Sequence, residues 1–357
     1  MRILPAACIL VFFVADVCAQ AISGKVVDAT TSQPLPFANV YINNSTIGTT
    51  TSQLGTFTLQ TTGAANIELI TSYVGYVSNR QTLAIVDGNI QDLVIRLEPS
   101  GEYLGEVEVV AKKDKAWDAM YNRFEKAFLG STANASHSKI LNPWVIDLRA
   151  EGSMIYANAK APVEIENKAL GYKVNFDLKE FAVSDSSFRI LGYSFFSELE
   201  PERKSDPRRW KKTREQAYDR SIQHLLLAII DNATKKNGLE LYKQLPGTMN
   251  MQKTQWFYEE ELGQRVVVIE PEQLNIQKTN GMVSMQLPEM LEVHFNRISA
   301  RKRVYRDVPF EISWIVPNTS RVLINKNGLP TDPNSISVYG YLASLRVADL
   351  MPINYQP

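Results

Sequence analysis

The chain has 357 residues, with 38 basic and 38 acidic side chains and 45% hydrophobic residues. A formal net charge of zero argues against a protein that binds nucleic acid through bulk charge. The apolar content is sufficient for packed cores and argues against long disordered stretches. The length is that of roughly two domains.

Residues 1–19 predict a secretory signal peptide. Arg2 supplies a positive start, and the stretch 3–14 is apolar apart from one proline. Val17 and Ala19 place small residues at the positions that a signal peptidase reads. The apolar run is shorter than the ~20 residues of a membrane-spanning helix. We therefore expect an exported protein, located in the periplasm or associated with the outer membrane.

Cysteine usage agrees with a leader at this end of the chain. The two cysteines, Cys8 and Cys18, both precede the expected cleavage after Ala19, so the mature chain has no thiol for a disulfide or a thiolate metal site. Lipidation at Cys18 is an alternative form of processing. Asp16 and Val17 are poor neighbours for it, because lipoprotein processing favours small residues there.

Residues 20–98 predict a β-sandwich. Apolar residues alternate with polar ones in several short segments, as at Ile22, Gly24 and Val26, and again at Phe57 and Leu59. Turn-forming residues separate these segments, which is the spacing typical of a sandwich.

Six segments of this region carry a set of motifs: ISGKVVD at 22–28, PLPFANVYI at 34–42, GTTT at 48–51, GTFTL at 55–59, SYVGY at 72–76 and LVIRL at 93–97. Together they resemble the carboxypeptidase-regulatory-like domain, a small transthyretin-like β-sandwich. The resemblance implies that fold and an exported compartment. It implies no reaction, because this module accompanies many unrelated partner domains.

Residues 99–113 are expected to be a linker, and residues 114–357 an α+β domain of unknown function. Trp117, Phe124 and Phe128 follow helical spacing, and we expect this aromatic face to pack on a sheet. A second helix is predicted over 206–236. Strands are predicted at 144–148, 154–159, 170–176, 187–196, 265–270, 291–298, 309–316 and 320–324. The sequence thus predicts a mostly β protein: a sandwich followed by an antiparallel sheet packed with two main helices.

The second region also carries recognisable motifs: EIENKALGY at 164–172, YGY at 339–341 and RVADLMP at 346–352. They look like those of a family of exported bacterial proteins that join the same sandwich to an uncharacterised C-terminal domain. This resemblance implies the architecture and nothing about mechanism.

Motifs for catalysis are missing from the sequence. A zinc carboxypeptidase needs a His-x-x-Glu pair, but the third residue after His137, His224 and His294 is Ile140, Leu227 and Arg297, respectively. The sequence also has no Gly-x-Ser-x-Gly elbow, Walker loop, dinucleotide fingerprint or calcium loop. We therefore expect no catalytic, cofactor-binding or metal-binding residues, and no cofactor.

A glycosidase-like pair of carboxylates would leave no linear signature. Two pairs share a face by their spacing, Glu164 with Glu166 and Glu289 with Glu292. We expect both pairs to be solvated surface groups.

One cluster of charge is a candidate for binding an anionic surface. Its residues are Arg208, Arg209, Trp210, Lys211, Lys212 and Arg214. Positive charge near a helix N-terminus is locally unfavourable, which invites a binding role. Trp210 would suit a membrane interface. The competing interpretation is a solvated face balanced by nearby glutamates.

From these observations we expect a non-enzymatic protein of the cell envelope. Its sandwich would be a docking or spacing module, and its C-terminal domain would bind an envelope protein, glycan or lipid, with peripheral membrane contact and no nucleic acid. The alternative is an envelope hydrolase acting on glycan or peptide through carboxylates that the sequence does not reveal. A third hypothesis is an assembly factor bound through the basic helix.

Overall fold

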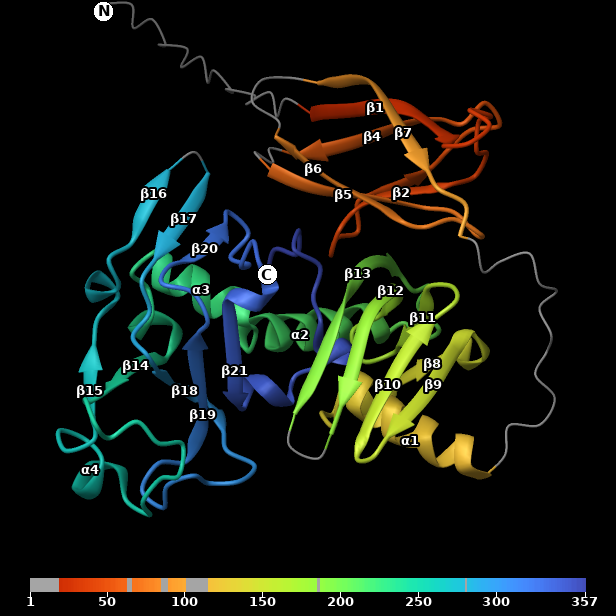
Figure 1. Cartoon of the computed structure of the whole chain (residues 1–357). Coiled ribbons are helices and arrows are strands. Elements are labelled where there is room, and N and C mark those ends of the chain that lie inside the picture. Colours follow the sequence, from red (N-terminus) through yellow and green to blue (C-terminus); the bar gives the residue numbers. More distant parts are fainter. Residues whose placement is uncertain (1–18, 63–65, 85–88, 101–114, 185–186, 280) are drawn as a thin grey trace, which may run out of the picture.

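The computed structural model describes residues 19–62, 66–84, 89–100, 115–184, 187–279 and 281–357. Residues 1–18 of the expected signal peptide and most of the expected linker lie outside these residues. The described part is mostly β, with a sandwich at the N-terminal end and an α+β region after it (Figure 1). The predicted fold class is therefore confirmed.

The sandwich is built from two antiparallel-rich sheets whose inner faces share one core. Its strands are β1 (Ala19–Asp28), β2 (Asn39–Ile42), β3 (Gly48–Thr50), β4 (Thr56–Thr62), β5 (Asn66–Ser72), β6 (Asn79–Ala84) and β7 (Ile90–Leu97). One sheet has the order β4-β1-β7 and the other β3-β2-β5-β6. Ile22, Val26, Val40 and Ile95 are fully buried between the sheets, as the alternation predicts.

A six-stranded sheet forms the first half of the α+β region. It contains β8 (Ser138–Ile140), β9 (Ile146–Glu151), β10 (Met154–Ala159), β11 (Val163–Asn167), β12 (Tyr172–Val183) and β13 (Phe188–Glu198). Helix α1 (Lys115–Leu129) packs on it through Phe124 and Phe128, which contact Phe181 and Phe176. The aromatic face of the predicted helix is thus a core-packing face.

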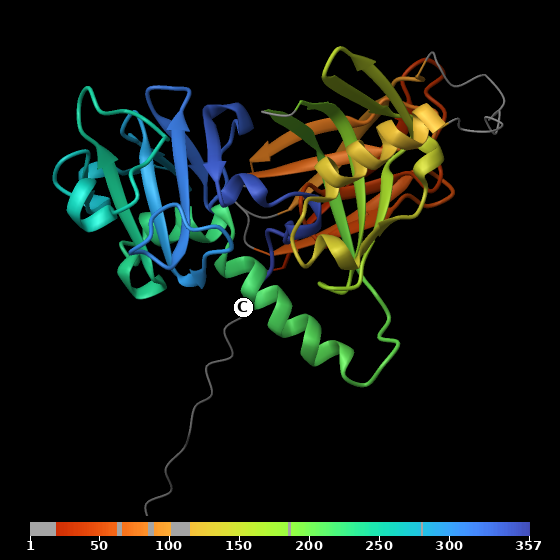
Figure 2. The same cartoon turned by 90° about the horizontal axis from the view of Figure 1, so that it is seen from below.

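The prediction of one continuous helix over 206–236 is wrong. The chain forms α2 (Asp206–Asp219) and α3 (Ile222–Ile230), with a break at Ser221. Ser221 has an extended backbone, and its hydroxyl accepts a hydrogen bond from the backbone N–H of His224, which caps α3. The break lets α2 and α3 pack on different sheets. Figure 2 shows α2 on the outside of the molecule.

Two further sheets form the second half, where a single sheet was expected. The larger has the order β15-β14-β18-β19-β21, and the smaller has the order β16-β17-β20. Their bounds are β14 (Leu239–Gln244), β15 (Val266–Ile269), β16 (Gln277–Thr279), β17 (Met282–Met285), β18 (Leu291–Ser299), β19 (Phe310–Pro317), β20 (Val322–Asn325) and β21 (Ile336–Gly340), with a short helix α4 (Phe257–Glu260).

The sandwich is fastened to the α+β region by the loop between β2 and β3. The backbone N–H of Asn44 donates to the carbonyl of Ser194 at 2.8 Å, and that of Phe196 donates to Ser45 at 2.9 Å. On the other side, the N–H of Ile353 donates to the carbonyl of Asn44 at 2.7 Å. These bonds continue the edge of β13 into the sandwich, so the two parts are held in one arrangement.

Candidate functional site

A buried charged cluster lies on one face of the central strand β18. Glu292 and His294 alternate with Leu291, Val293 and Phe295, whose side chains pack in the core beneath α3. Both polar side chains are fully buried on the opposite face. The Nε2–H of His294 donates to Oε1 of Glu292 at 2.8 Å. The cluster therefore sits inside the protein, although its residues are polar.

Glu292 receives four partners. The Nε1–H of Trp314 donates to its Oε2 at 2.8 Å, and the hydroxyl of Tyr305 donates to its Oε1 at 3.2 Å. The ammonium of Lys253 lies 2.9 Å from its Oε2. Burial alone raises the pKa of Glu292, but the hydrogen bond from His294 and the charge of Lys253 outweigh it and lower that pKa to about 2. The carboxylate is therefore ionised in the folded protein.

A second buried carboxylate, Glu261, completes the cluster. Its Oε2 lies 3.7 Å from the ammonium of Lys253, and its Oε1 lies 3.1 Å from the guanidinium of Arg265. The same Oε1 accepts hydrogen bonds from the backbone N–H and the hydroxyl of Thr254, both at 3.0 Å. Lys253 thus stands between two carboxylates, and a buried charge with such partners is tolerated where an isolated one is not.

An aromatic shell closes the cluster. The ring of His294 lies 4.5 Å from that of Tyr242, 4.7 Å from Phe257 and 5.1 Å from Phe310, measured between centroids. The side chain of Lys253 is only 1% exposed, and those of Glu261 and Glu292 are 0% exposed. A substrate cannot reach these buried side chains in this arrangement. We therefore interpret the cluster as structural: it holds the surrounding chain in position.

The cluster holds two loops in position. Lys253 and Glu261 belong to the segment 246–261, and Tyr305 belongs to the segment 300–309. The two segments are also joined directly, since the backbone N–H of Arg306 donates to the carbonyl of Gln255 at 2.6 Å. Both lie at the lower end of the five-stranded sheet, at the opposite end from the sandwich (Figure 1).

Asp307 ties the second loop to helix α4 in the first. Its carboxylate accepts the backbone N–H groups of Phe257 at 2.8 Å and Tyr258 at 2.9 Å. Burial tends to raise the pKa of Asp307, but these two hydrogen bonds lower it below its ordinary value. The carboxylate therefore fixes the first turn of α4 against the second loop.

These two loops expose large apolar and basic side chains. We call this set the loop surface; it consists of Met249, Met251, Trp256, Tyr258, Lys302, Arg303, Val304 and Arg306. Exposed Trp, Tyr, Met and Arg side chains are typical of interaction surfaces. Two acidic side chains, Glu259 and Glu260, are exposed on α4 beside it.

The predicted anionic-surface candidates on α2 fall into two groups. Trp210 is buried, and its Nε1–H donates to the carbonyl of Lys168 at 3.0 Å. Arg214 donates to the carbonyl of Leu170 at 2.7 Å and lies 3.9 Å from the ring centroid of Tyr172. These two side chains hold α2 on the sheet, so they do not belong to the exposed face.

The exposed face of α2 keeps the other candidates. Arg208, Lys211 and Lys212 are exposed, and Arg209 pairs with Asp206 at 3.0 Å. Binding of an anionic surface by this face stays a prediction.

Replacing Trp210 by alanine should therefore act on stability. We expect the free energy of unfolding to fall by about 3 kcal/mol, because the ring fills the space over Gly171 and leaves a cavity. Urea unfolding monitored by circular dichroism measures the change. Lys211→Ala, at the neighbouring exposed position, should stay within about 0.5 kcal/mol of the wild type. Equal effects of the two substitutions would contradict the inward placement of Trp210.

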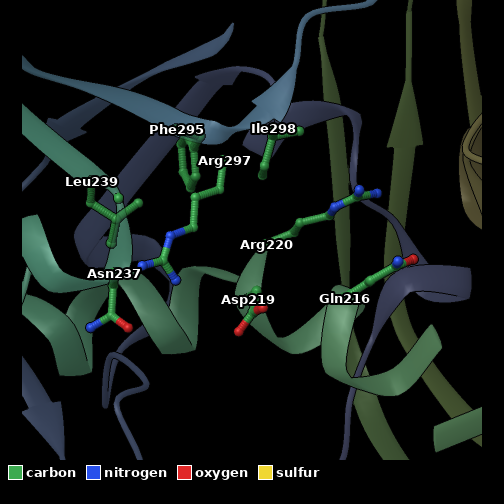
Figure 3. Close-up of a pocket in the computed structure, with 9 residues that line it drawn as sticks. Gln216, Asp219, Arg220, Asn237, Leu239, Phe295, Arg297 and Ile298 are labelled. Carbon is green, nitrogen blue, oxygen red and sulfur yellow. The ribbon is translucent and has the colours of Figure 1, made fainter. Parts of the chain in front are cut away.

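Two small pockets lie elsewhere in the described residues. The first, of about 160 Å³, is lined by Asp219, Arg220 and Arg297, among others. Figure 3 shows that Arg220 points away from Arg297, so the two guanidinium groups do not converge. The second, of about 230 Å³, lies at the junction with the sandwich and is lined by Tyr172, Arg214 and Tyr355, among others.

Sequence reasoning missed the buried cluster. Glu289 and Glu292 were expected to be a solvated pair, but Glu289 is exposed while Glu292 is fully buried. Glu164 and Glu166 are half-buried and pair with Lys173 and Lys168, in keeping with surface groups. The local pattern carried no signal of this burial, because the alternation of Glu292 and His294 with large apolar residues ordinarily indicates a strand with one solvated face.

In the described part of the chain, no group of three or more His, Cys, Asp or Glu side chains is placed to hold a metal ion. Among the helices of that part, none has both the length and the apolar character needed to cross a bilayer.

Comparisons with known proteins identify one part of the chain, its N-terminal region. No curated protein matches the chain. Solved structures with local similarity include the pilus 2b backbone protein of group B streptococcus, with 17% identity over 23% of this chain and 42% of that one and a TM-score of 0.20. A type II cohesin–X-dockerin complex from Acetivibrio cellulolyticus has 18% identity over 22% and 58%, with a TM-score of 0.18.

A DUF3823 family protein from Parabacteroides merdae has 14% identity over 51% of this chain and 82% of that one, with a TM-score of 0.19. The match thus spans about half of the first two structures. Likeness at these TM-scores carries no argument about function. The family model of the CarboxypepD_reg-like domain, by contrast, matches residues 22–109. The N-terminal sandwich of this chain is therefore a carboxypeptidase-regulatory-like domain.

Proposed function

We propose that the protein is an exported, non-enzymatic binding protein of the cell envelope, in the periplasm or at the outer membrane. Its α+β region binds an envelope component through the loop surface, and its carboxypeptidase-regulatory-like sandwich serves as a docking or spacing module. The observation that carries the proposal is the loop surface itself, held by a buried charged cluster.

The internal support of the loops favours a binding role. Lys253 and Glu261 anchor the first loop, Tyr305 anchors the second, and Asp307 joins them. A surface that is ordered before binding loses little conformational entropy when a partner arrives. Burying charged groups also costs free energy, because they lose their hydration. In our proposal this cost is offset by holding the two loops in one shape.

The hydrolase alternative receives less support from the same residues. A glycosidase-like mechanism needs two carboxylates that face a substrate. The structure does bring Glu261 and Glu292 together, but Lys253 lies between them and both side chains are fully buried.

The fixed junction supports a spacing role for the sandwich. The loop around Asn44 and Ser45 bonds to both β13 and the C-terminal segment near Ile353. The loop surface and the sandwich lie at opposite ends of the molecule (Figure 1). A partner bound at one end would therefore be held at a defined distance from the sandwich.

Site-specific photo-crosslinking in intact cells tests the proposal. A photoreactive amino acid is placed at Met251 or Tyr258 on the loop surface, at Lys212 on α2, and at Thr82 on an exposed position of the sandwich. We expect specific adducts from the two loop positions, whereas an adduct from Thr82 would indicate a docking role for the sandwich and its absence a spacing role. Adducts from Lys212 without any from the loops would overturn the proposal in favour of the basic helix, and a lack of adducts at every position would also overturn it.

A further inference from the structure

We infer that the component bound by the loop surface is an anionic phospholipid bilayer. This inference rests on the proposed function and names its partner. It concerns the interfacial layer of a membrane, where headgroups meet the acyl chains. The argument combines the apolar side chains, the basic side chains and the shape of the loop surface.

The apolar part of the loop surface suits the membrane interface. Tyr258 is 58% exposed, Met249 is 52% exposed and Trp256 is 38% exposed. Trp and Tyr have an apolar ring and a polar edge, which is why they are favoured where hydrocarbon meets water. Methionine adds an adaptable apolar chain that tolerates an irregular environment.

The basic part lies on the adjacent loop and supplies charge complementarity. Lys302, Arg303 and Arg306 are exposed around the exposed side chain of Val304. Asp307 offsets part of this positive charge, because the hydrogen bonds from the backbone N–H groups of α4 keep its carboxylate ionised. Basic side chains close to an anionic membrane strengthen binding by roughly fivefold each.

Two nearby acids limit this attraction. Glu259 and Glu260 are exposed on α4, beside Tyr258. Charge alone therefore gives modest binding, and apolar insertion alone would not select anionic lipid. We expect both contributions to be needed, with binding that weakens in high salt but does not disappear.

The shape favours a bilayer over a folded protein partner. The exposed apolar side chains belong to two loops that are joined by the hydrogen bond from Arg306 to Gln255. A folded protein partner would have to offer pockets of matching shape for such anchors. A bilayer needs only projecting side chains with a basic rim. The fixed loops around Lys253 and Glu261 would present them without further ordering.

Vesicle binding tests this inference. The mature chain is mixed with vesicles of phosphatidylcholine containing 30% phosphatidylglycerol, or of phosphatidylcholine alone, and co-sedimentation gives the partition coefficient. We expect binding to the anionic vesicles to be at least about tenfold stronger. Trp256→Ser combined with Tyr258→Ser should weaken it by at least about tenfold. Lys302→Glu combined with Arg303→Glu and Arg306→Glu should remove the preference for anionic lipid.

A matched control lies on α2. Arg208→Glu with Lys211→Glu and Lys212→Glu reverses the same number of exposed charges at a different place. This variant should bind as the wild type does. A loss of binding in this variant alone would overturn the assignment to the loop surface, as would equal binding to both kinds of vesicle.

Brominated lipids report insertion directly. Bromine in the acyl chains should quench part of the tryptophan fluorescence of the wild type, and Trp256→Phe should abolish the quenching while leaving the unfolding midpoint unchanged. Unchanged quenching in Trp256→Phe would contradict the inference. If vesicles are not bound but the loop positions still crosslink to an envelope protein, the lipid assignment fails and the proposed function stands. If neither occurs, both fail.

Discussion

Replacing Lys253 by methionine is expected to lower the free energy of unfolding by about 3–5 kcal/mol. Lys253 lies 2.9 Å from Glu292 and 3.7 Å from Glu261, and its removal leaves two buried carboxylates without their shared cation. Breaking a buried ion pair from one side costs more than the pair contributed, because the remaining charge stays desolvated. Urea unfolding at neutral pH measures the change.

Two matched variants separate this cause from loss of packing. Lys243→Met makes the same substitution at an exposed position of β14 and should change stability by less than about 0.5 kcal/mol. Adding Glu292→Gln to Lys253→Met removes one of the stranded charges and should restore part of the loss. A double variant that is less stable than the single one would show that charge is not the cause.

The second large effect is a loss of stability in acid. The pKa of Glu292 is lowered from 4.5 to about 2 in the folded protein. Because the folded state binds this proton more weakly than the unfolded state, the carboxylate stabilises the fold above pH ~4.5, and the contribution disappears as the pH falls towards 2. A shift of this size corresponds to about 3 kcal/mol.

Urea unfolding of the wild type and of Glu292→Gln between pH 6 and pH 3 measures this contribution. Other carboxylates titrate in the same window, so the informative quantity is the difference between the two proteins. The wild type should lose stability more steeply than the variant as the pH falls. Parallel curves would mean that folding does not lower the pKa of Glu292, and a shallower loss in the wild type would mean that folding raises it.

The sandwich was predictable because its signals are local. Ile22 and Val26 alternate with polar residues within one strand, and the turns that separate the strands contain their own glycines and asparagines. The parallel pairing of β1 with β7 brings together residues nearly seventy positions apart, which no local pattern reports.

The division of the long helix into α2 and α3 could have been predicted from the sequence. Ser221 precedes an apolar run, and a serine there is a preferred N-cap, which argues for a new helix at Ile222. The inward direction of Trp210 could also have been predicted from the sequence, because Asp206, Trp210 and Ala217 share one helix face by their spacing. All three are buried in the structure.

The burial of the charged cluster was not predictable from local pattern. Glu292 and His294 occupy alternate positions of a strand, which ordinarily indicates a solvated face. That face is covered by Lys253 and Phe257 from an earlier segment and by Tyr305 from a later loop. These covering residues are distant from β18 in the sequence. A local sequence pattern therefore does not report their contacts with Glu292 and His294.

Hydrogen–deuterium exchange with native envelope membranes tests the central claim most directly. Backbone exchange of residues 20–357 is followed by mass spectrometry with and without membranes isolated from the producing cells. The account predicts slowed exchange in the segments 249–258 and 301–306, with the α2 segment 206–212 unchanged. Slowed exchange at α2 with none in the loops would contradict it.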